Sequence, residues 1–206
     1  MSNQLPPLAR QMLASLFPRR HRRWVKAALV VAGLAAAYFY SRGDADAADR
    51  SRRVRETRQI VRVVDGDTLL LDGKERVRLL GVDTPESKES DKLYRVAAEA
   101  GVKLADVVAL GKLATAETEK LCRDGKCQLV YDEQQGRKDN YGRTLAYVYL
   151  PDGVSLNAEL IKRGYATVYR HYQYGEKKRF LALEAEARAD RRGLWKNKIF
   201  QKMAKE

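Results

Sequence analysis

The chain has 206 residues, of which 45% are apolar, and its formal net charge is +13. Its length suffices for one globular domain with an appendage and leaves no room for a second core of similar size. Residues 1–58 hold twelve Lys and Arg against four Asp and Glu, a net +8, which leaves +5 for residues 59–206. Because a basic N-terminal segment also suits membrane topology, the charge alone does not identify a nucleic-acid partner.

The N-terminal segment combines a basic leader with an apolar run. Residues 1–23 end in Arg19-Arg20-His21-Arg22-Arg23, and residues 24–40 contain one charge, Lys26. This run has 17 residues, the lower limit for a bilayer span, and its last 14 residues also fit the core of a signal peptide. Residues 24–40 therefore predict a hydrophobic helix that is a membrane anchor or a signal-peptide core. A buried core helix is a third, less favoured interpretation.

Both membrane interpretations predict the same orientation, with the basic cluster in the cytoplasm and the rest of the chain exported. We favour a single-pass anchor whose interfacial residues are Tyr38, Phe39 and Tyr40, with the following domain outside the cytoplasm. The alternative is a secreted or periplasmic protein, cleaved near Ala45-Asp46-Ala47. Residues 41–57, rich in Ala, Asp, Arg and Ser, predict a solvated linker.

A folded domain is predicted for residues 58–198, with residues 199–206 as a tail. Turn signals at Asp65-Gly66-Asp67 and Asp72-Gly73 separate short apolar runs, and Gly111 is expected to divide a helical segment at 87–121. The predicted strands are 59–64, 68–71, 76–79, 127–132 and 143–150, and further helices are predicted at 156–163 and 177–192. This order predicts an α+β fold, a five-stranded OB-type β-barrel with packed helices.

Acidic residues gather where these first strands end. Asp67 follows the first strand, and Asp83 and Glu86 lie in the loop after the third. Because no Cys or His accompanies them, the donors are hard oxygen atoms, which favour calcium over a soft metal. Arg78 lies between these carboxylates, and Arg143 follows much later. A divalent cation beside two guanidinium groups predicts a pocket for a phosphate.

The two cysteines, Cys122 and Cys127, flank the turn signal Asp124-Gly125. With two thiols and no nearby His, a structural zinc site is disfavoured. The sequence leaves two states open, a short-loop disulfide in an exported domain and two free thiols in a cytosolic one.

Three short motifs stand in an order that characterises one family. They are Asp65-Gly66-Asp67-Thr68, then Arg78 followed by Val82-Asp83-Thr84-Pro85-Glu86, then Tyr141-Gly142-Arg143. The chain resembles the thermonuclease, or staphylococcal-nuclease-like, family, and the likeness extends more weakly from about Arg58 to Trp195. Each motif alone has an ordinary structural role, such as an Asp-Gly turn, but three in order are specific.

The resemblance implies a calcium-dependent nuclease that hydrolyses phosphodiester bonds of DNA and RNA with little sequence preference and leaves 3'-phosphorylated products. Single-stranded DNA and RNA are the expected substrates, the membrane is a partner through residues 24–40, and no protein partner can be inferred. The alternative is a noncatalytic nucleic-acid-binding OB module, anchored at the membrane. Relatives of that kind lack several of the site residues, all of which are present here.

The resemblance also assigns roles to single residues. The implied Ca²⁺ ligands are the carboxylates of Asp67 and Asp83 and the backbone carbonyl of Thr84. The implied catalytic residues are Arg78, Glu86 and Arg143, with Glu86 acting on the attacking water and the arginines on the phosphate. Candidate stacking faces for nucleobases are Tyr141, Tyr169 and Tyr172, which are otherwise ordinary core and rim tyrosines. Residues 87–112 form an insert relative to the usual spacing, without a readable role.

Overall fold

The computed structural model describes residues 56–204. The basic leader, the hydrophobic helix predicted at 24–40 and nearly all of the linker lie outside the described residues. Among residues 56–204, none of the helices has the length and apolar content that a membrane span requires.

Five strands close into a barrel, so the predicted α+β fold with a five-stranded barrel is confirmed. The strands are β1 (Glu56–Asp65), β2 (Thr68–Leu71), β3 (Arg76–Leu79), β5 (Lys126–Val130) and β6 (Thr144–Tyr149). Their order around the barrel is β1, β2, β3, β6, β5, and only the β3–β6 pair of the barrel is parallel. Every residue of β6 is buried, as its two apolar faces predicted.

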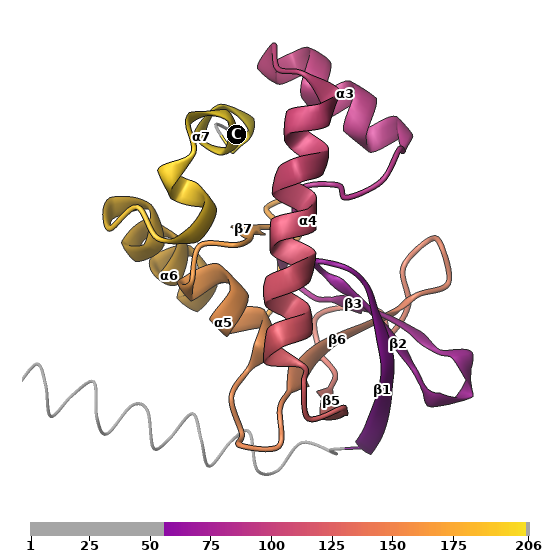
Figure 1. Ribbon diagram of the computed structural model, residues 1–206. Coiled ribbons are helices and arrows are strands. Elements are labelled where there is room, and N and C mark those ends of the chain that lie inside the picture. The colour runs from indigo at the N-terminus through magenta and orange to yellow at the C-terminus, as the bar shows by residue number, and fades with distance from the viewer. Residues whose placement is uncertain (1–55, 205–206) are drawn as a thin grey trace, which may run out of the picture. The chain divides into compact units, whose positions relative to one another are not determined.

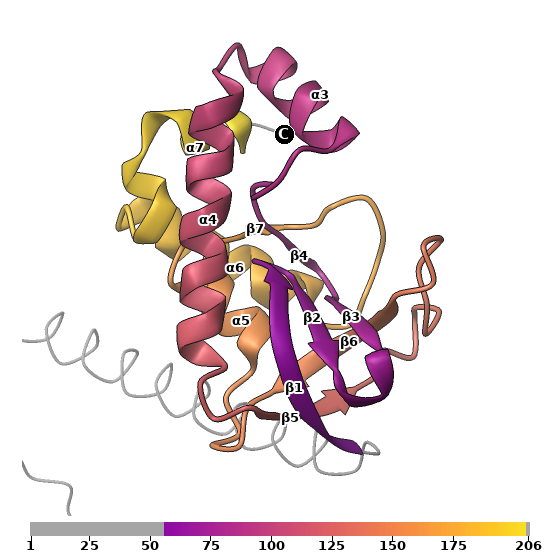
Figure 2. The ribbon, with the colours of Figure 1, turned by 45° about the vertical axis from the view of Figure 1, so that its right-hand side comes forward.

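Helices pack against the barrel at β1 and β6 and against one another. They are α3 (Asp91–Ala100), α4 (Leu104–Leu121), α5 (Leu156–Lys162), α6 (Lys177–Ala189) and α7 (Lys198–Met203). The long helix α4 packs against β1 on one side and α5 on the other, while α3 and α7 meet near its N-terminal end (Figures 1 and 2). The apolar side chains of the barrel and of α5 and α6 form one continuous core.

The structure corrects the predicted division of the 87–121 helical segment. The chain breaks at Gly101, which ends α3 in the left-handed conformation with a φ of 61°. Gly111, expected to be the break, lies inside α4, where a Cβ atom would stand 2.3 Å from the carbonyl oxygen of Glu86. Glycine is required at position 111 by close packing and not by backbone conformation, and the sequence does not distinguish these two requirements.

Five short elements were not predicted, namely two strands, two 3₁₀ turns and one helix. Strands β4 (Val82–Asp83) and β7 (Thr167–Val168) pair as a separate antiparallel sheet, and both are too short to give an alternating pattern. The predicted hairpin at Asp72-Gly73 is confirmed, since β2 and β3 pair antiparallel, and a 3₁₀ turn, η1 (Asp72–Lys74), connects its strands. Helix α7 extends into the segment predicted as a tail. It is held by Phe200, whose buried ring lies 4.9 Å from that of Trp195, which belongs to the 3₁₀ turn η2 (Gly193–Lys196).

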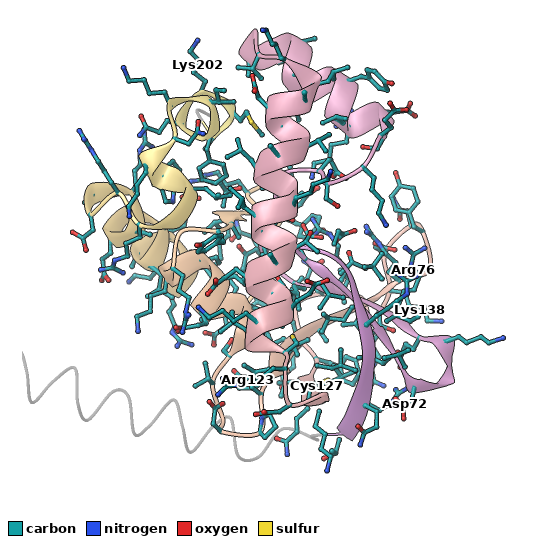
Figure 3. All side chains as sticks on the ribbon, viewed as in Figure 1. Asp72, Arg76, Arg123, Cys127, Lys138 and Lys202 are labelled. Atoms are coloured by element: carbon teal, nitrogen blue, oxygen red, sulfur yellow. The ribbon has the colours of Figure 1, made fainter. Side chains whose placement is uncertain are left out.

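Cys122 and Cys127 are both free and buried near the C-terminal end of α4 (Figure 3). Burial, together with the neighbouring Cys127, raises the pKa of the Cys122 thiol to about 12. Burial likewise raises the pKa of Cys127, to about 11. Because the thiolate is the reactive form, both cysteines act here as small core residues.

One buried hydrogen bond ties α4 to the turn that carries Asp67. The hydroxyl of Thr118, which is fully buried, donates to the carbonyl oxygen of Gly66 at 2.7 Å. Gly66 also packs tightly against Thr84, since a Cβ atom on Gly66 would lie 2.7 Å from the Thr84 hydroxyl oxygen. The turn is therefore held between α4 and the loop that follows β4.

We expect Thr118→Val to lower the free energy of unfolding by about 1–3 kcal/mol, because the buried Gly66 carbonyl loses its donor. The matched control is Thr115→Val in the same helix, whose hydroxyl bonds only to the Gly111 carbonyl within α4 at 3.0 Å. Urea unfolding followed by circular dichroism measures both variants. Equal losses for the two would show that the link between α4 and the turn contributes nothing.

Candidate active site

Strand pairing brings a buried arginine against two aspartates. Asp67 ends the turn before β2, and in the β2–β3 ladder Thr68 pairs with Arg78. Arg78 forms an ion pair with Asp67 through Nη1, and its Nη2 donates to Asp83 Oδ1 at 2.9 Å. The side chains of Arg78 and Asp67 are only 13% and 8% exposed. A charge that is buried this deeply needs its partners, so the guanidinium fixes the β1–β2 turn and β4 relative to β3.

The carboxylate of Asp67 accepts bonds on both oxygens. Its Oδ2 accepts from the backbone N–H of Thr84 at 3.0 Å and from the Thr84 hydroxyl at 3.1 Å, and its Oδ1 accepts from the Thr68 hydroxyl at 3.2 Å. Burial opposes ionisation, but the charges of Arg78 and Lys92 and the Thr84 bond outweigh it and hold the pKa of Asp67 below its usual range. Asp67 therefore remains a carboxylate.

The neighbouring Asp65 has a higher proton affinity than Asp67. Burial and the negative charge of Asp67 raise the pKa of Asp65 to about 6. Two carboxyl groups in one turn thus separate in pKa, because Asp67 has the cationic partners and Asp65 has the anionic neighbour. As the pH falls, Asp65 takes up a proton first and leaves the charge on Asp67.

Lys92, which the sequence did not single out, bridges the remaining carboxylates. Its Nζ lies 2.8 Å from Asp83 Oδ1 and 3.0 Å from Glu86 Oε1. Burial disfavours the charged amine, but the carboxylates of Asp83, Asp67 and Glu86 outweigh it and raise the pKa of Lys92 above its usual value. The site therefore contains a second cation beside Arg78.

Helix α3 delivers Lys92 from within the insert at 87–112. The helix starts after Ser90, whose hydroxyl accepts from the backbone N–H of Leu93 at 3.1 Å, so that Lys92 lies in its first turn. The Ser90 cap could have been read from the sequence as a helix start. The sequence does not show that Lys92 and not Lys88 belongs to the site. This depends on which lysine the folded chain brings near the carboxylates.

Arg143 approaches from the strand beside Arg78. It directly precedes β6 and stands two residues before Leu145, the parallel partner of Arg78. Its Nε donates to Asp139 Oδ2 at 2.7 Å, and its guanidinium lies 5.4 Å from the centre of the exposed Tyr141 ring. Within residues 56–204, Arg143 makes no ion pair with the carboxylates around Arg78. Arg143 is instead held by Asp139 of its own loop.

Tyr172 packs beside Tyr169, and the charges of Arg78 and Asp139 both act on its hydroxyl. Its ring is 4.8 Å from that of Tyr169. Burial raises the pKa of the Tyr172 hydroxyl, Tyr169 and Asp139 add to this, and the positive charge of Arg78 opposes it. A side chain that is influenced by both Arg78 and Asp139 is within electrostatic reach of both regions. The pair Tyr169 and Tyr172 therefore belongs to the surroundings of the site.

The acidic donors are of the chemical type that a hard cation prefers, but in this structure they are paired with Arg78 and Lys92. The charged acceptors are carboxylate oxygens alone, and Asp83 and Glu86 already share one cation, the Nζ of Lys92. Across residues 56–204, no three acidic, His or Cys side chains are grouped closely enough to hold a metal ion. Arg78 and Lys92 stand between the carboxylates, so a divalent cation would compete with Lys92 for Asp83 and Glu86.

Comparison with known proteins places most of the site in one family. The family described as staphylococcal nuclease homologue matches residues 76–197, which include every predicted site residue except Asp67. A thermonuclease of Staphylococcus intermedius is 35% identical over 170 residues, 81% of this chain and 91% of that protein. An uncharacterised protein of Methanocaldococcus jannaschii is 36% identical over 146 residues, covering 66% and 70%. Endonuclease YncB of Bacillus subtilis is 37% identical over 139 residues, covering 65% and 59%.

Proposed function

The chain belongs to the staphylococcal nuclease family and is a hydrolase of nucleic acids, and we propose that it is a calcium-dependent, sequence-nonspecific enzyme that leaves 3'-phosphorylated products. The observation that carries the proposal is the buried Arg78 guanidinium between Asp67 and Asp83. A noncatalytic binding module has no need for this arrangement, because burying three charged groups is costly. Catalysis of phosphoryl transfer needs both the cation and the metal-binding carboxylates at one point.

Calcium is the proposed cofactor. The proposed ligands are the carboxylates of Asp67 and Asp83 and the backbone carbonyl of Thr84, all oxygen donors of the kind that calcium prefers. When bound, the ion supplies positive charge that neutralises the phosphate and polarises it toward attack. The protein's part is to hold these donors rigidly, which the Arg78 ion pairs and the Thr84 hydrogen bonds to Asp67 support.

The chain's own residues carry out the remaining steps. Glu86 orients a water molecule and takes its proton as the water oxygen attacks phosphorus. The bond from phosphorus to the 5' oxygen breaks, the departing 5' oxygen takes up a proton from solvent to become a hydroxyl, and the phosphate stays on the 3' side. Arg78 and Arg143 each donate two hydrogen bonds to phosphate oxygens and oppose the charge that grows on them. Arg143 must exchange Asp139 for the phosphate, and Arg78 must likewise exchange Asp67 and Asp83, so that both charges stay paired in both states.

Two exposed tyrosines and one half-buried tyrosine suit single-stranded DNA and RNA. Tyr141 is 85% exposed beside Arg143, and Tyr169 packs against Tyr172. Aromatic faces stack on any unpaired base, which supports cleavage with little sequence preference. We propose Tyr141, Tyr169 and Tyr172 as the base-stacking residues.

We also propose that the nuclease domain is exported and held at the membrane by a single span. The support is the apolar run at 24–40 behind a basic cluster, as well as the domain start that the sequence predicts near residue 58. Cleavage after export would give a secreted or periplasmic form.

Calcium should be required for cleavage of single-stranded DNA by the full-length protein, and a chelator should abolish it. Arg143→Ala should lower kcat by about 10²–10³, because a charge-stabilising donor is lost in the transition state. Arg137→Ala is the matched control, since Arg137 is in the same loop but lies over the Tyr131 ring at 4.5 Å. End-group analysis of the products should find 3' phosphates. Undiminished cleavage in the presence of chelator, and by the Arg143 variant, would contradict the mechanism.

Lys92→Met should bind calcium more tightly, because the ion no longer competes with an ammonium group for Asp83 and Glu86. The expected gain is about tenfold in Kd, the equivalent of one charged hydrogen bond. Isothermal titration calorimetry with calcium alone measures it, with Lys103→Met as an exposed control. Weaker calcium binding by Lys92→Met would mean that the lysine supports the ion site instead of competing for it.

A reporter enzyme fused after Glu206 tests the proposed export. A reporter that is active only outside the cytoplasm should be active in this fusion, and deletion of residues 24–40 should abolish that activity. Activity of a reporter that works only in the cytoplasm would refute the topology. Fractionation of the same fusions then separates anchored from released protein.

A further inference from the structure

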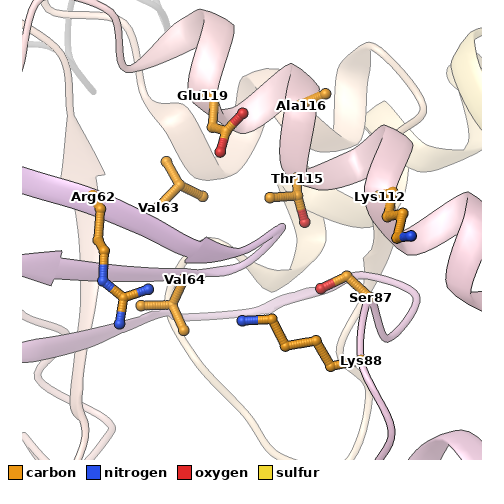
Figure 4. Close-up of a pocket in the computed structure, with 9 residues that line it drawn as sticks. All are labelled: Arg62, Val63, Val64, Ser87, Lys88, Lys112, Thr115, Ala116 and Glu119. Carbon is orange, nitrogen blue, oxygen red and sulfur yellow. The ribbon is translucent and has the colours of Figure 1, made fainter.

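A second basic pocket lies beside the carboxylate site. It has a volume of about 300 Å³ and is formed by β1, the loop that follows Glu86, and α4 (Figure 4). Three cationic side chains line it, and they come from three different elements, namely Arg62 from β1, Lys88 from the loop and Lys112 from α4. Figure 4 shows Lys88 extending back along the loop toward Val64 and Arg62. The fold therefore assembles this charge from segments that are far apart in the chain.

The cations of this pocket are available to a ligand. In the part of the chain from 56 to 204, Arg62, Lys88 and Lys112 form no ion pair, in contrast to Arg78 and Lys92. Glu119 is the single carboxylate in the lining, so three positive charges face one negative charge. A cluster of like charges is unfavourable by itself, and binding of an anion relieves this repulsion.

Two hydroxyl groups add hydrogen-bonding capacity between the cations. Ser87 and Thr115 both line the pocket, and their hydroxyls face the same gap in Figure 4. The Thr115 hydroxyl already donates its one proton to the Gly111 carbonyl at 3.0 Å, so Ser87 supplies the hydroxyl donor for a phosphate oxygen. Cations combined with hydroxyl groups in a concave site are the chemistry that binds phosphate oxygens in nucleic-acid backbones.

The pocket shares one loop with the proposed catalytic glutamate. Ser87 and Lys88 directly follow Glu86, and the Glu86 carbonyl packs so closely on Gly111 that a Cβ atom there would stand 2.3 Å away. Lys112 follows Gly111 on α4. A polynucleotide that places one phosphate at Arg78 can therefore continue past Glu86 onto this pocket.

We propose that this pocket is a second phosphate subsite, which binds a backbone phosphate of the polynucleotide outside the bond that is cleaved. The path of the polynucleotide from Arg78 to this pocket rests on the proposed function. Binding of the polynucleotide to the pocket itself does not require cleavage. Because the subsite contacts backbone and not bases, it contributes affinity without sequence preference. It favours long single strands over dinucleotides, since only a long strand reaches both positions.

The test uses the full-length protein with the triple substitution Arg62→Ala, Lys88→Ala and Lys112→Ala. Fluorescence anisotropy measures binding of a labelled 20-nucleotide oligothymidylate in chelator, where the proposed cleavage is off, over a series of salt concentrations. Because the variant lacks three cations that would neutralise phosphates, the slope of log K against log salt should fall by about 2, and affinity at low salt should fall by about tenfold or more. The kcat/KM for a dinucleotide substrate with calcium should stay unchanged.

A control variant with the same loss of charge separates this site from general electrostatics. The substitutions Lys103→Ala, Lys178→Ala and Lys202→Ala remove exposed lysines outside the pocket. Equal loss of oligonucleotide affinity in both triple variants, or no loss in the pocket variant, would overturn the proposal. Because all six side chains are exposed, urea midpoints should match the wild type, which excludes unfolding as the cause.

Two further outcomes distinguish the subsite from a headgroup site and from the nuclease reaction itself. Glycerol 3-phosphate, which has the chemistry of a lipid headgroup, should not displace the oligonucleotide from the wild-type protein. If glycerol 3-phosphate displaced the labelled oligonucleotide at the same concentrations as unlabelled oligonucleotide does, the pocket would be a site for single headgroups and the proposal would be overturned. An inactive wild-type protein whose oligonucleotide binding still depends on the pocket would refute the proposed nuclease reaction and leave the subsite standing.

Discussion

The buried ion pairs of Arg78 are the constraint on which the rest of the site depends. A guanidinium with 13% exposure must stay paired, and its partners Asp67 and Asp83 come from the β1–β2 turn and from β4. Breaking either pair would leave an uncompensated buried charge, at a cost of about 3–5 kcal/mol. The arginine thus determines how the β1–β2 turn and β4 lie relative to β3, and Lys92 extends the network to Glu86 and α3.

The fold provides a rigid frame around this charged cluster. The closed barrel fixes β1, β2 and β3, and α4 is attached to the turn through the Thr118 bond to Gly66 and to the following loop through the close contact at Gly111. The small β4–β7 sheet holds Asp83 from its other side, since Thr167 pairs with it. The carboxylates of the site repel one another, and the surrounding fold, together with Arg78 and Lys92, holds them in place.

The sequence predicts what depends on local pattern and turn chemistry. Alternating apolar residues and Asp-Gly turns give β2 and β3 with the correct bounds, and the meander places Asp67 beside Arg78. The role of Lys92, the packing of Gly111 and the pocket at Arg62 depend on contacts between segments distant in the chain, and no local signal indicates them. Arg143 could be predicted only in part. The pairing of β3 with β6 brings it to the strand next to Arg78, but its ion pair with Asp139 could not be read from the sequence.

A crystal structure of the full-length protein with calcium and a nonhydrolysable single-stranded oligonucleotide would test the central claim most directly. We expect one calcium ion on the carboxylates of Asp67 and Asp83, with the Nζ of Lys92 displaced. We also expect Arg78 and Arg143 both to donate to one phosphate. A calcium ion bound elsewhere, with Arg143 still paired to Asp139 and the phosphate away from Arg78, would contradict the mechanism.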